Sequence, residues 1–388
     1  MPETIPSHIR AGSKKIGLAL SGGGVRASAY HAGVLLYLAE QGLLEDIVHV
    51  SSVSGGTLFS GLVFARSGLH WPNSDTYVHD IFPYIREILT TKSLQKEMFL
   101  RLCYPRNWSF CLSRVKILAQ SIEALWGIKG TLSDLSSNVV WSINGSTLET
   151  GQGFSFKSCR LGDDVLGYAD APNFDLATAM AVSAALPTAI GPLELECDTF
   201  SWSQDRASHG KTYVPPYKTI HIYDGGMYDN LGMESLFDVA TQSFTKNSGI
   251  DFMISSDAGS PYEHSQVGNP CNPKRLERLF RLLVDQARAL RARSFVHFLH
   301  ENPHCALYCH IGMMPQNMVQ KIAQSIELDD ETRMALGTNT WLSEEEVLYA
   351  QRYKTTLHRL SPKAFHIISR HGYESAKMSY LKQLRLLC

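Results

Sequence analysis

The chain has 388 residues, enough for one large or two ordinary domains, and 44% of them are hydrophobic against 19% charged. This composition is typical of a globular protein, and the net charge of −1 gives no indication of nucleic-acid binding. No stretch approaches about 18 consecutive apolar residues, and residues 1–15 lack an apolar signal core, so neither a transmembrane helix nor a secretory leader is expected. The eight scattered cysteines favour reduced thiols and therefore a cytoplasmic protein.

The first third of the sequence alternates strand patterns with helix patterns. Residues 15–21 form an apolar run typical of a buried strand, and residues 25–41 carry apolar positions at helical spacing. Residues 46–56 are predicted to form a second strand that ends in a glycine turn and leads into an apolar helix. Two strand–turn–helix units in succession predict an α/β core with parallel strands. Residues 70–130 are aromatic-rich and mostly helical in period, and we expect either a lid over a pocket or additional core.

The remainder of the chain divides near residue 270. Before this point we expect strands within 139–156, 218–232 and 249–259, and a helix of small residues at 173–187. Beyond Pro273 the pattern is helical, and residues 274–300 carry a single apolar stripe. These patterns predict one domain over residues 1–270 and a helical region over residues 271–388.

Two further patterns lie in the C-terminal region. Seven Lys and Arg against two acids between 274 and 293 are typical either of a solvated face on a packed helix or of a surface that contacts anionic lipid. A second cluster consists of His297, His300, His304, Cys305, Cys309 and His310. Its spacing fits no standard zinc motif, and the alternative is a helix end at which the dipole favours histidine. We expect no metal site, with structural zinc as the alternative.

A glycine-rich turn follows the first predicted strand. Gly22, Gly24 and Ala27 match the dinucleotide-binding fingerprint G-x-G-x-x-G/A. That kind of site also needs an acidic residue near the end of the second strand, to bind the ribose hydroxyls. The second strand here ends in Val-Ser-Ser-Val-Ser-Gly-Gly, which supplies no carboxylate. The missing acid disfavours a nicotinamide or flavin enzyme, and the glycine loop needs another explanation.

The second glycine turn carries a candidate nucleophile. Ser54 lies in a near match to the nucleophile elbow G-x-S-x-G, in which Ser52 stands where the first glycine is usual. A sharp strand-to-helix turn exposes the serine hydroxyl, and small neighbours let the substrate approach. A serine nucleophile also needs donors for the oxyanion that it generates. The amides of Gly22, Gly23 and Gly24, at the end of the adjacent predicted strand, are candidates for that oxyanion hole.

The nucleophile needs a base. Asp224 ends a predicted strand before two glycines, where a carboxylate can project from the edge of the sheet; the alternative is an ordinary Asp-Gly turn. The chain has fifteen histidines, but none lies in a small-residue turn after a strand. His31 lies within a predicted amphipathic helix and is expected to be packed there. A Ser–His–Asp triad remains an alternative to a base at Asp224.

Four sequence blocks occur in an order that resembles the patatin-like phospholipases, which are related to the catalytic domains of cytosolic phospholipase A2. The blocks are Gly22-Gly-Gly-Val-Arg26, Ser52-Val-Ser-Gly-Gly56, Ala181-Val-Ser-Ala-Ala-Leu-Pro187 and Asp224-Gly-Gly-Met-Tyr-Asp-Asn230. Each block is weak alone, but four in order are specific. The resemblance covers residues 15–260, and "SINGSTLETG" at 142–151 also resembles a strand of that family.

The resemblance implies a three-layer α/β/α core with a mainly parallel central sheet. It also implies a Ser–Asp dyad without histidine, at Ser54 and Asp224, and an oxyanion hole at Gly22, Gly23 and Gly24. Arg26 matches an arginine beside that loop that suits an anionic headgroup. Residues 271–388 match no family that we can name.

The function implied is that of a lipid acyl hydrolase of the phospholipase A type, which cleaves acyl esters of membrane phospholipids without a cofactor. A water-poor pocket raises the pKa of an aspartate toward the range in which it can act as a base. The expected partners are membrane phospholipid, contacted peripherally, and an activating ligand or protein; no nucleic acid is expected. The alternative is a non-catalytic lipid- or partner-binding module on the same fold.

Overall fold

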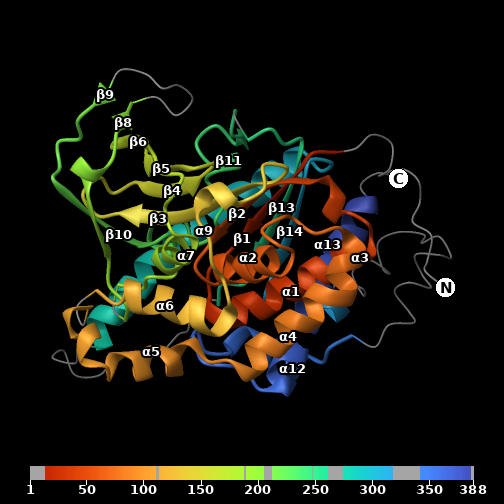
Figure 1. Ribbon diagram of the computed structural model, residues 1–388. Coiled ribbons are helices and arrows are strands. Elements are labelled where there is room, and N and C mark those ends of the chain that lie inside the picture. The colour runs from red at the N-terminus through yellow and green to blue at the C-terminus, as the bar shows by residue number, and fades with distance from the viewer. Residues whose placement is uncertain are drawn as a thin grey trace.

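The computed structural model (Figure 1) describes residues 14–110, 113–187, 189–204, 212–246, 248–260, 274–317 and 341–385. A mixed sheet forms its centre, and five neighbouring strands of that sheet are parallel. In spatial order they are β14 (Ala306–His310), β13 (Phe252–Asp257), β1 (Ile16–Leu20), β2 (Ile47–Val53) and β3 (Val140–Thr147). Helical segments connect β1 to β2 and β2 to β3, as parallel strands require.

Beyond β3 the sheet becomes antiparallel, and short turns join β3 and the next three strands in succession. These strands are β4 (Gly153–Lys157), β5 (Arg160–Asp163), β6 (Gly167–Asp170), β8 (Trp202–Ser203) and β9 (Thr212–Tyr213). A branch is formed by β10 (Thr219–Asp224), which pairs with β3 and with β7 (Leu193–Glu196). The predicted strands within 139–156, 218–232 and 249–259 are all confirmed.

Helices cover both faces of the parallel strands. In β1, Leu18 and Leu20 belong to the larger apolar cluster, with α1 (Gly24–Glu40), whereas Ala19 on the opposite face packs with Phe295 and Phe298 of α9 (Lys274–Glu301). The same face as α1 carries α2 (Gly55–Arg66), α4 (Phe82–Thr91) and α13 (Pro362–Arg385). This arrangement confirms the three-layer α/β/α core and its mainly parallel centre.

The segment between β2 and β3 is mostly helical, as its sequence predicts. It contains α3 (Ser74–Thr76), α4, α5 (Leu94–Leu102) and α6 (Val115–Trp126), and Figure 1 shows α5 and α6 side by side below the sheet. α6 packs in turn on α7 (Leu176–Ser183). Side chains such as Ile85, Leu94 and Leu118 belong to the main apolar cluster, so the inner faces of these helices are part of the core.

The C-terminal region, expected to be helical, contributes a strand to the central sheet. β14 pairs with β13 in parallel, and its apolar residues at 306, 307 and 309 are buried on both faces. α12 (Glu344–Arg352) follows, and α13 packs lengthwise along α1. The described parts of this region, 274–317 and 341–385, therefore pack into the same apolar clusters as the N-terminal part. Within the described residues, no helix is long and apolar enough to cross a membrane.

Candidate active site

The pairing along β3 brings the ends of two strands together. β4 occupies one edge of β3 over residues 143–146, so β2 and β10 share the other edge. β2 runs parallel to β3 and ends with Val53 opposite Asn144, whereas β10 runs antiparallel and ends with Asp224 opposite Gly145. The carboxyl ends of β2 and β10 therefore meet at consecutive positions of β3. This register places Ser54, directly after β2, beside Asp224.

Ser54 forms a strained turn between β2 and α2. Its φ of 50° and ψ of −117° lie in a region that non-glycine residues rarely adopt, at a cost of about 1–3 kcal/mol. The two glycines that follow are required by close packing, because a Cβ on Gly55 would lie 2.3 Å from the Gly24 carbonyl oxygen and one on Gly56 2.3 Å from that of Leu20. Strain of this kind occurs at functional sites, where the surrounding structure holds it.

Hydrogen bonds to neighbouring elements hold the Ser54 turn in place. The Ser54 amide donates to the carbonyl and hydroxyl oxygens of Ser183, each at 3.1 Å. Ser52, which stands where the motif usually has glycine, bonds Thr57 at 3.0 Å and accepts the indole N–H of Trp141 at 2.8 Å. These bonds satisfy the buried Ser52 hydroxyl, so the substitution leaves the elbow intact.

Asp224 is buried directly beside the nucleophile candidate. Its carboxyl accepts the Gly226 amide at 2.7 Å, and the Ser54 side chain lies close enough to lower the pKa of the carboxyl. Burial raises the pKa of Asp224 to about 7, and the Gly226 amide and the Ser54 side chain offset that rise only in part. A carboxyl with that pKa exchanges protons near neutral pH, which an exposed aspartate does not.

The glycine loop after β1 has two amides without an internal acceptor. The Gly22 amide donates to the Asn230 carbonyl at 3.0 Å. Gly23 and Gly24 adopt φ values of 142° and 62°, and neither amide has an acceptor among the residues that the structure describes. A Cβ on Gly22 would lie 3.2 Å from the Ser54 Cβ, so the loop lies next to the nucleophile candidate.

The C-terminal segment at 353–360, which we call the strap, fixes the far side of that loop. The Thr356 carbonyl accepts the Val25 amide at 3.0 Å, and a Cβ on Gly24 would lie 2.5 Å from the same oxygen. The strap also binds the helical segment, because its Leu357 carbonyl accepts the Gln95 amide at 3.1 Å. Residues far beyond the four sequence blocks thus position the glycine loop.

The guanidinium group of Arg26 is buried and does not reach the protein surface. Arg26 is only 2% exposed, and its guanidinium donates to the carbonyls of Tyr353 at 2.7 Å and Ala258 at 3.0 Å and to the Ser260 hydroxyl. Burial, reinforced by the charge of Arg288, lowers the pKa of Arg26 to about 10. Carbonyl acceptors occupy this side chain, which ties α1 to the strap and to the loop after β13. The predicted role of Arg26 as a ligand for an anionic headgroup stays a prediction.

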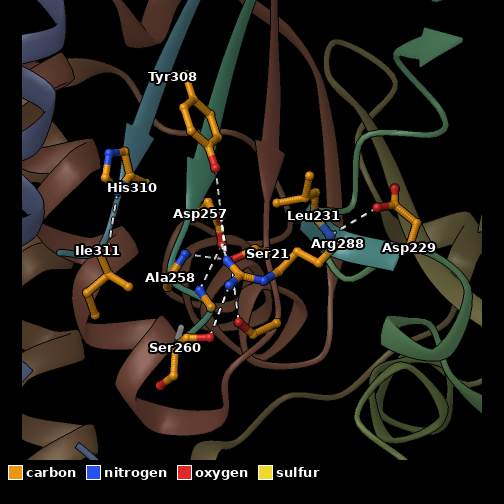
Figure 2. A network of polar contacts seen from close by, with 12 residues as sticks. Ser21, Asp229, Leu231, Asp257, Ala258, Ser260, Arg288, Tyr308, His310 and Ile311 are labelled. Atoms are coloured by element: carbon orange, nitrogen blue, oxygen red, sulfur yellow. Dashed lines mark hydrogen bonds and ion pairs between the residues drawn. The ribbon is translucent and has the colours of Figure 1, made fainter. Parts of the chain in front are cut away.

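A second polar network anchors the ends of β13 and β14 to α9 (Figure 2). Arg288 reaches the Asp257 carboxylate at 2.7 Å, and the Tyr308 hydroxyl donates to the same carboxylate at 2.7 Å. Burial alone would raise the pKa of Asp257, but Arg288 and these donors hold it below its ordinary value. The Ala258 amide donates to the Ser21 hydroxyl at 2.7 Å, so the network also fixes the residue before the glycine loop.

The other candidate groups lie elsewhere. His31 is buried and bonds Ser256 at 2.8 Å and the Ser21 carbonyl at 2.9 Å, and burial lowers its pKa to about 4. No histidine of the described residues hydrogen-bonds Ser54 or Asp224. The 297–310 cluster is divided among the end of α9, the turn that follows it and β14, and no group of three His, Cys, Asp or Glu in the described part of the chain is placed to hold a metal.

Three residues were missed as site residues in the sequence. Ser183 and Asn230 lie within the blocks that carried the resemblance, but nothing in their spacing indicates a bond to Ser54 or to the glycine loop. Thr356 gives no sequence signal, because its main-chain carbonyl makes the contact.

A family model described as patatin-like phospholipase matches residues 18–237, which is more than half of the chain and includes Ser54 and Asp224. The chain belongs to this family. Among solved structures, human GIVD cytosolic phospholipase A2 superposes with a TM-score of 0.54 at 14% identity, over 96% of this chain and 60% of that one. The same human protein in complex with methyl γ-linolenyl fluorophosphonate gives a TM-score of 0.51 at 16% identity, over 96% and 59%.

The likeness to the human protein shows a shared fold, and this chain spans about 60% of that protein's length. No curated protein matches the sequence. The earlier resemblance to patatin-like phospholipases is thereby confirmed at the level of family and fold.

Proposed function

We propose that this protein is a lipid acyl hydrolase of the phospholipase A type, with Ser54 as nucleophile and Asp224 as its base. The observation that carries the proposal is the position of the Ser54 turn beside the buried Asp224 carboxyl, whose pKa burial raises to about 7. A group with that pKa is half deprotonated near neutral pH, where it can take a proton from serine and later return it.

The reaction has two stages. The Asp224 carboxylate takes the Ser54 proton as the serine oxygen attacks the ester carbonyl, and the resulting intermediate collapses to an acyl-enzyme. The leaving alcohol, a lysophospholipid when the substrate is a phospholipid, departs with the proton from Asp224. Asp224 then deprotonates a water molecule, which attacks the acyl carbonyl. As the acyl–Ser54 bond breaks, Asp224 gives this proton to the Ser54 oxygen and the fatty acid is released.

We propose the amides of Gly23 and Gly24 as the oxyanion donors. Both lack an internal acceptor in the described structure, whereas the Gly22 amide already donates to Asn230. The proposal therefore keeps two of the three amides that the sequence suggested. Donors fixed in advance stabilise the developing charge by about 3–4 kcal/mol each, because they need not reorganise.

Two comparisons support lipid as the substrate class. The family model is that of patatin-like phospholipases, and the superposed human phospholipase is described in complex with a fluorophosphonate that carries a linolenyl chain. The cytoplasmic location and the activating ligand or protein that the sequence suggested stay predictions.

The test is hydrolysis of a soluble short-chain ester and of phospholipid in mixed micelles by the purified chain. Ser54→Ala and Asp224→Asn should each lose activity on both substrates by at least about a hundredfold, while both variants stay folded by circular dichroism. His31→Gln, beyond hydrogen-bond contact with the dyad, serves as the control for a histidine mechanism. A folded wild type that binds lipid but releases no fatty acid would favour the non-catalytic binding module instead.

A further inference from the structure

The tip formed by the end of α5 and the 3₁₀ turn at Pro105–Phe110 exposes a cluster of large apolar side chains. Phe99, Leu100, Tyr104 and Trp108 are between 47% and 68% exposed. These four lie within ten consecutive residues; of the other exposed large apolar side chains in the described chain, three lie on α9 and the rest are scattered. We call residues 99–108 the apolar tip. A concentration of this kind marks a binding surface more often than scattered exposed residues do.

The helix that carries the tip is packed on one side only. Leu94 and Met98 of α5 are buried against the core, one helical turn apart. At about 100° per residue, Phe99 and Leu100 point away from that buried face. The exposure of the tip therefore follows from the orientation of α5. The helix packs against the core through Leu94 and Met98, and Phe99 and Leu100 lie on its other side.

Basic residues accompany the apolar tip along the chain. Between residues 92 and 108 the chain has four basic residues, at 92, 96, 101 and 106, and one acid, Glu97, which is paired with Arg101 at 2.9 Å. A groove of about 760 Å³ beside the tip is lined by Arg101, Arg106 and Lys129 together with the single acid Glu123. This charge is complementary to an anionic partner.

We propose that the apolar tip is a membrane-docking surface, which inserts its aromatic side chains between the headgroups of an anionic phospholipid bilayer. The proposal rests on the proposed function, since it names how the enzyme reaches its substrate. Trp and Tyr favour the boundary between headgroups and acyl chains, and lysine and arginine at that depth contact lipid phosphates. The Trp108 indole N–H donates to the Leu102 carbonyl at 3.2 Å, so insertion leaves no unpaired donor there.

A rival surface lies on α9, where Leu279, Leu283 and Leu290 are exposed at helical spacing. That stripe contains no tryptophan or tyrosine, and two of the α9 arginines are used internally, Arg288 with Asp257 and Arg291 with Asp229. The apolar tip is favoured because it combines aromatic side chains with basic residues that face the same groove.

Binding is measured with the Ser54→Ala chain, so that hydrolysis cannot alter the vesicles. Trp108 is well exposed, whereas Trp71, Trp126, Trp141 and Trp202 are buried and Trp341 is partly buried. Vesicles of phosphatidylcholine with added phosphatidylserine should therefore shift the tryptophan fluorescence to the blue, and Trp108→Phe should abolish most of that shift. A shift of the same size in Trp108→Phe overturns the proposal.

Cosedimentation with the same vesicles measures the affinity. Phe99→Ala combined with Trp108→Ala should lower partitioning by about tenfold or more, since each large side chain loses its transfer from water. Arg106→Gln should lower it about fivefold on anionic vesicles and leave binding to pure phosphatidylcholine unchanged. Leu148→Ala, at an exposed apolar residue elsewhere, is the matched control and should have no effect.

The outcomes separate this proposal from the proposed function. With Ser54 intact, the tip variants should keep wild-type activity on the soluble ester and lose activity only on vesicles. Loss of vesicle binding in Leu283→Ala with none in the tip variants would move the docking surface to α9 and overturn the proposal. Absence of ester hydrolysis alongside tip-dependent binding would instead contradict the proposed function alone.

Discussion

Asp224 shows how burial of one carboxyl sets both activity and stability. Because burial raises its pKa to about 7, the group is mostly protonated in mildly acidic solution and cannot accept the Ser54 proton there. We expect kcat/KM on a soluble ester to rise about tenfold per pH unit below this pKa and to level off above it. A pH–rate profile measures this directly, and a flat profile through pH 7 would show that another group is the base.

The same pKa shift means that Asp224 lowers the stability of the folded state at higher pH. Its folded pKa of about 7 exceeds the ordinary value of 3.8, so between these values the folded state binds the proton more tightly and stability falls as pH rises. We expect Asp224→Asn to have a higher Tm than the wild type at pH 8, with the difference vanishing near pH 4. Thermal unfolding at both pH values checks this, and an equal difference at the two would contradict it.

We expect Arg26 to support activity by holding the glycine loop in place, without contacting the substrate. Its contacts with Tyr353 and Ala258 hold the helix start that follows the glycine loop. We expect Arg26→Ala to lower the Tm and to reduce kcat on a neutral soluble ester and on phospholipid by the same factor. Parallel kinetics on both substrates test this; a loss confined to phospholipid would restore Arg26 as a headgroup ligand.

Some residues of the candidate site can be identified from the sequence, and others cannot. Turn chemistry and motif order single out Ser54 and Asp224 in the sequence, and the structure places them side by side. Their catalytic roles stay a proposal. The contacts of Arg26 could not be predicted, since Tyr353 and Ala258 act through main-chain carbonyls that carry no side-chain signal. The bond that occupies the Gly22 amide, likewise to a carbonyl, was hidden for the same reason.

At the scale of elements, α1 was predictable but its partner was not. The apolar spacing at 25–41 indicates a helix with a buried face, and α13 packs along it at two glycines. A Cβ on Gly33 would lie 1.7 Å from the Ser369 carbonyl oxygen, and one on Gly372 2.0 Å from that of Tyr30. Such a contact depends on residues more than three hundred positions apart, which periodicity cannot relate.

Gly33→Ala tests that contact by the sign of its effect. Within a helix this substitution ordinarily stabilises by up to about 1 kcal/mol. Here the added methyl group must displace α13, so we expect destabilisation of about 1–3 kcal/mol or more. Urea unfolding measures the change, and a more stable variant would show that α1 and α13 do not pack as closely as the structure has them.

Strand β14 shows the limit of the sequence patterns. Its five residues follow a histidine-rich helix end, in a region that the sequence predicted to be helical. Cys309 and His310 were considered only as part of an alternative metal cluster. The burial of Cys309 and the pairing with β13 give the run its structure, and both come from tertiary contacts. The predicted helix of small residues at 173–187 is shorter in the structure, ending at Ser183, which is tied to the Ser54 amide.

At the scale of the whole molecule, the C-terminal region completes the core. The pair of Arg288 with Asp257 joins α9 to the sheet, and their side chains are 13% and 3% exposed. Removing one partner leaves a buried charge, so we expect Arg288→Gln to destabilise by about 3–5 kcal/mol. Arg281→Gln is the matched control on the same helix, because its pair with Glu277 is solvent-exposed and should contribute about 0.3–0.5 kcal/mol. Equal losses in urea unfolding would contradict a structural role for the buried pair.

Labelling by a fluorophosphonate probe tests the dyad most directly, because the probe reacts with an activated serine and needs no knowledge of the lipid substrate. Intact mass and peptide mapping should find one adduct, on Ser54, formed faster above pH 7 than below it. Ser54→Ala should give no adduct, and Asp224→Asn should react at least about a hundredfold more slowly. An adduct on another residue, or an unchanged rate in Asp224→Asn, would contradict the Ser54–Asp224 dyad.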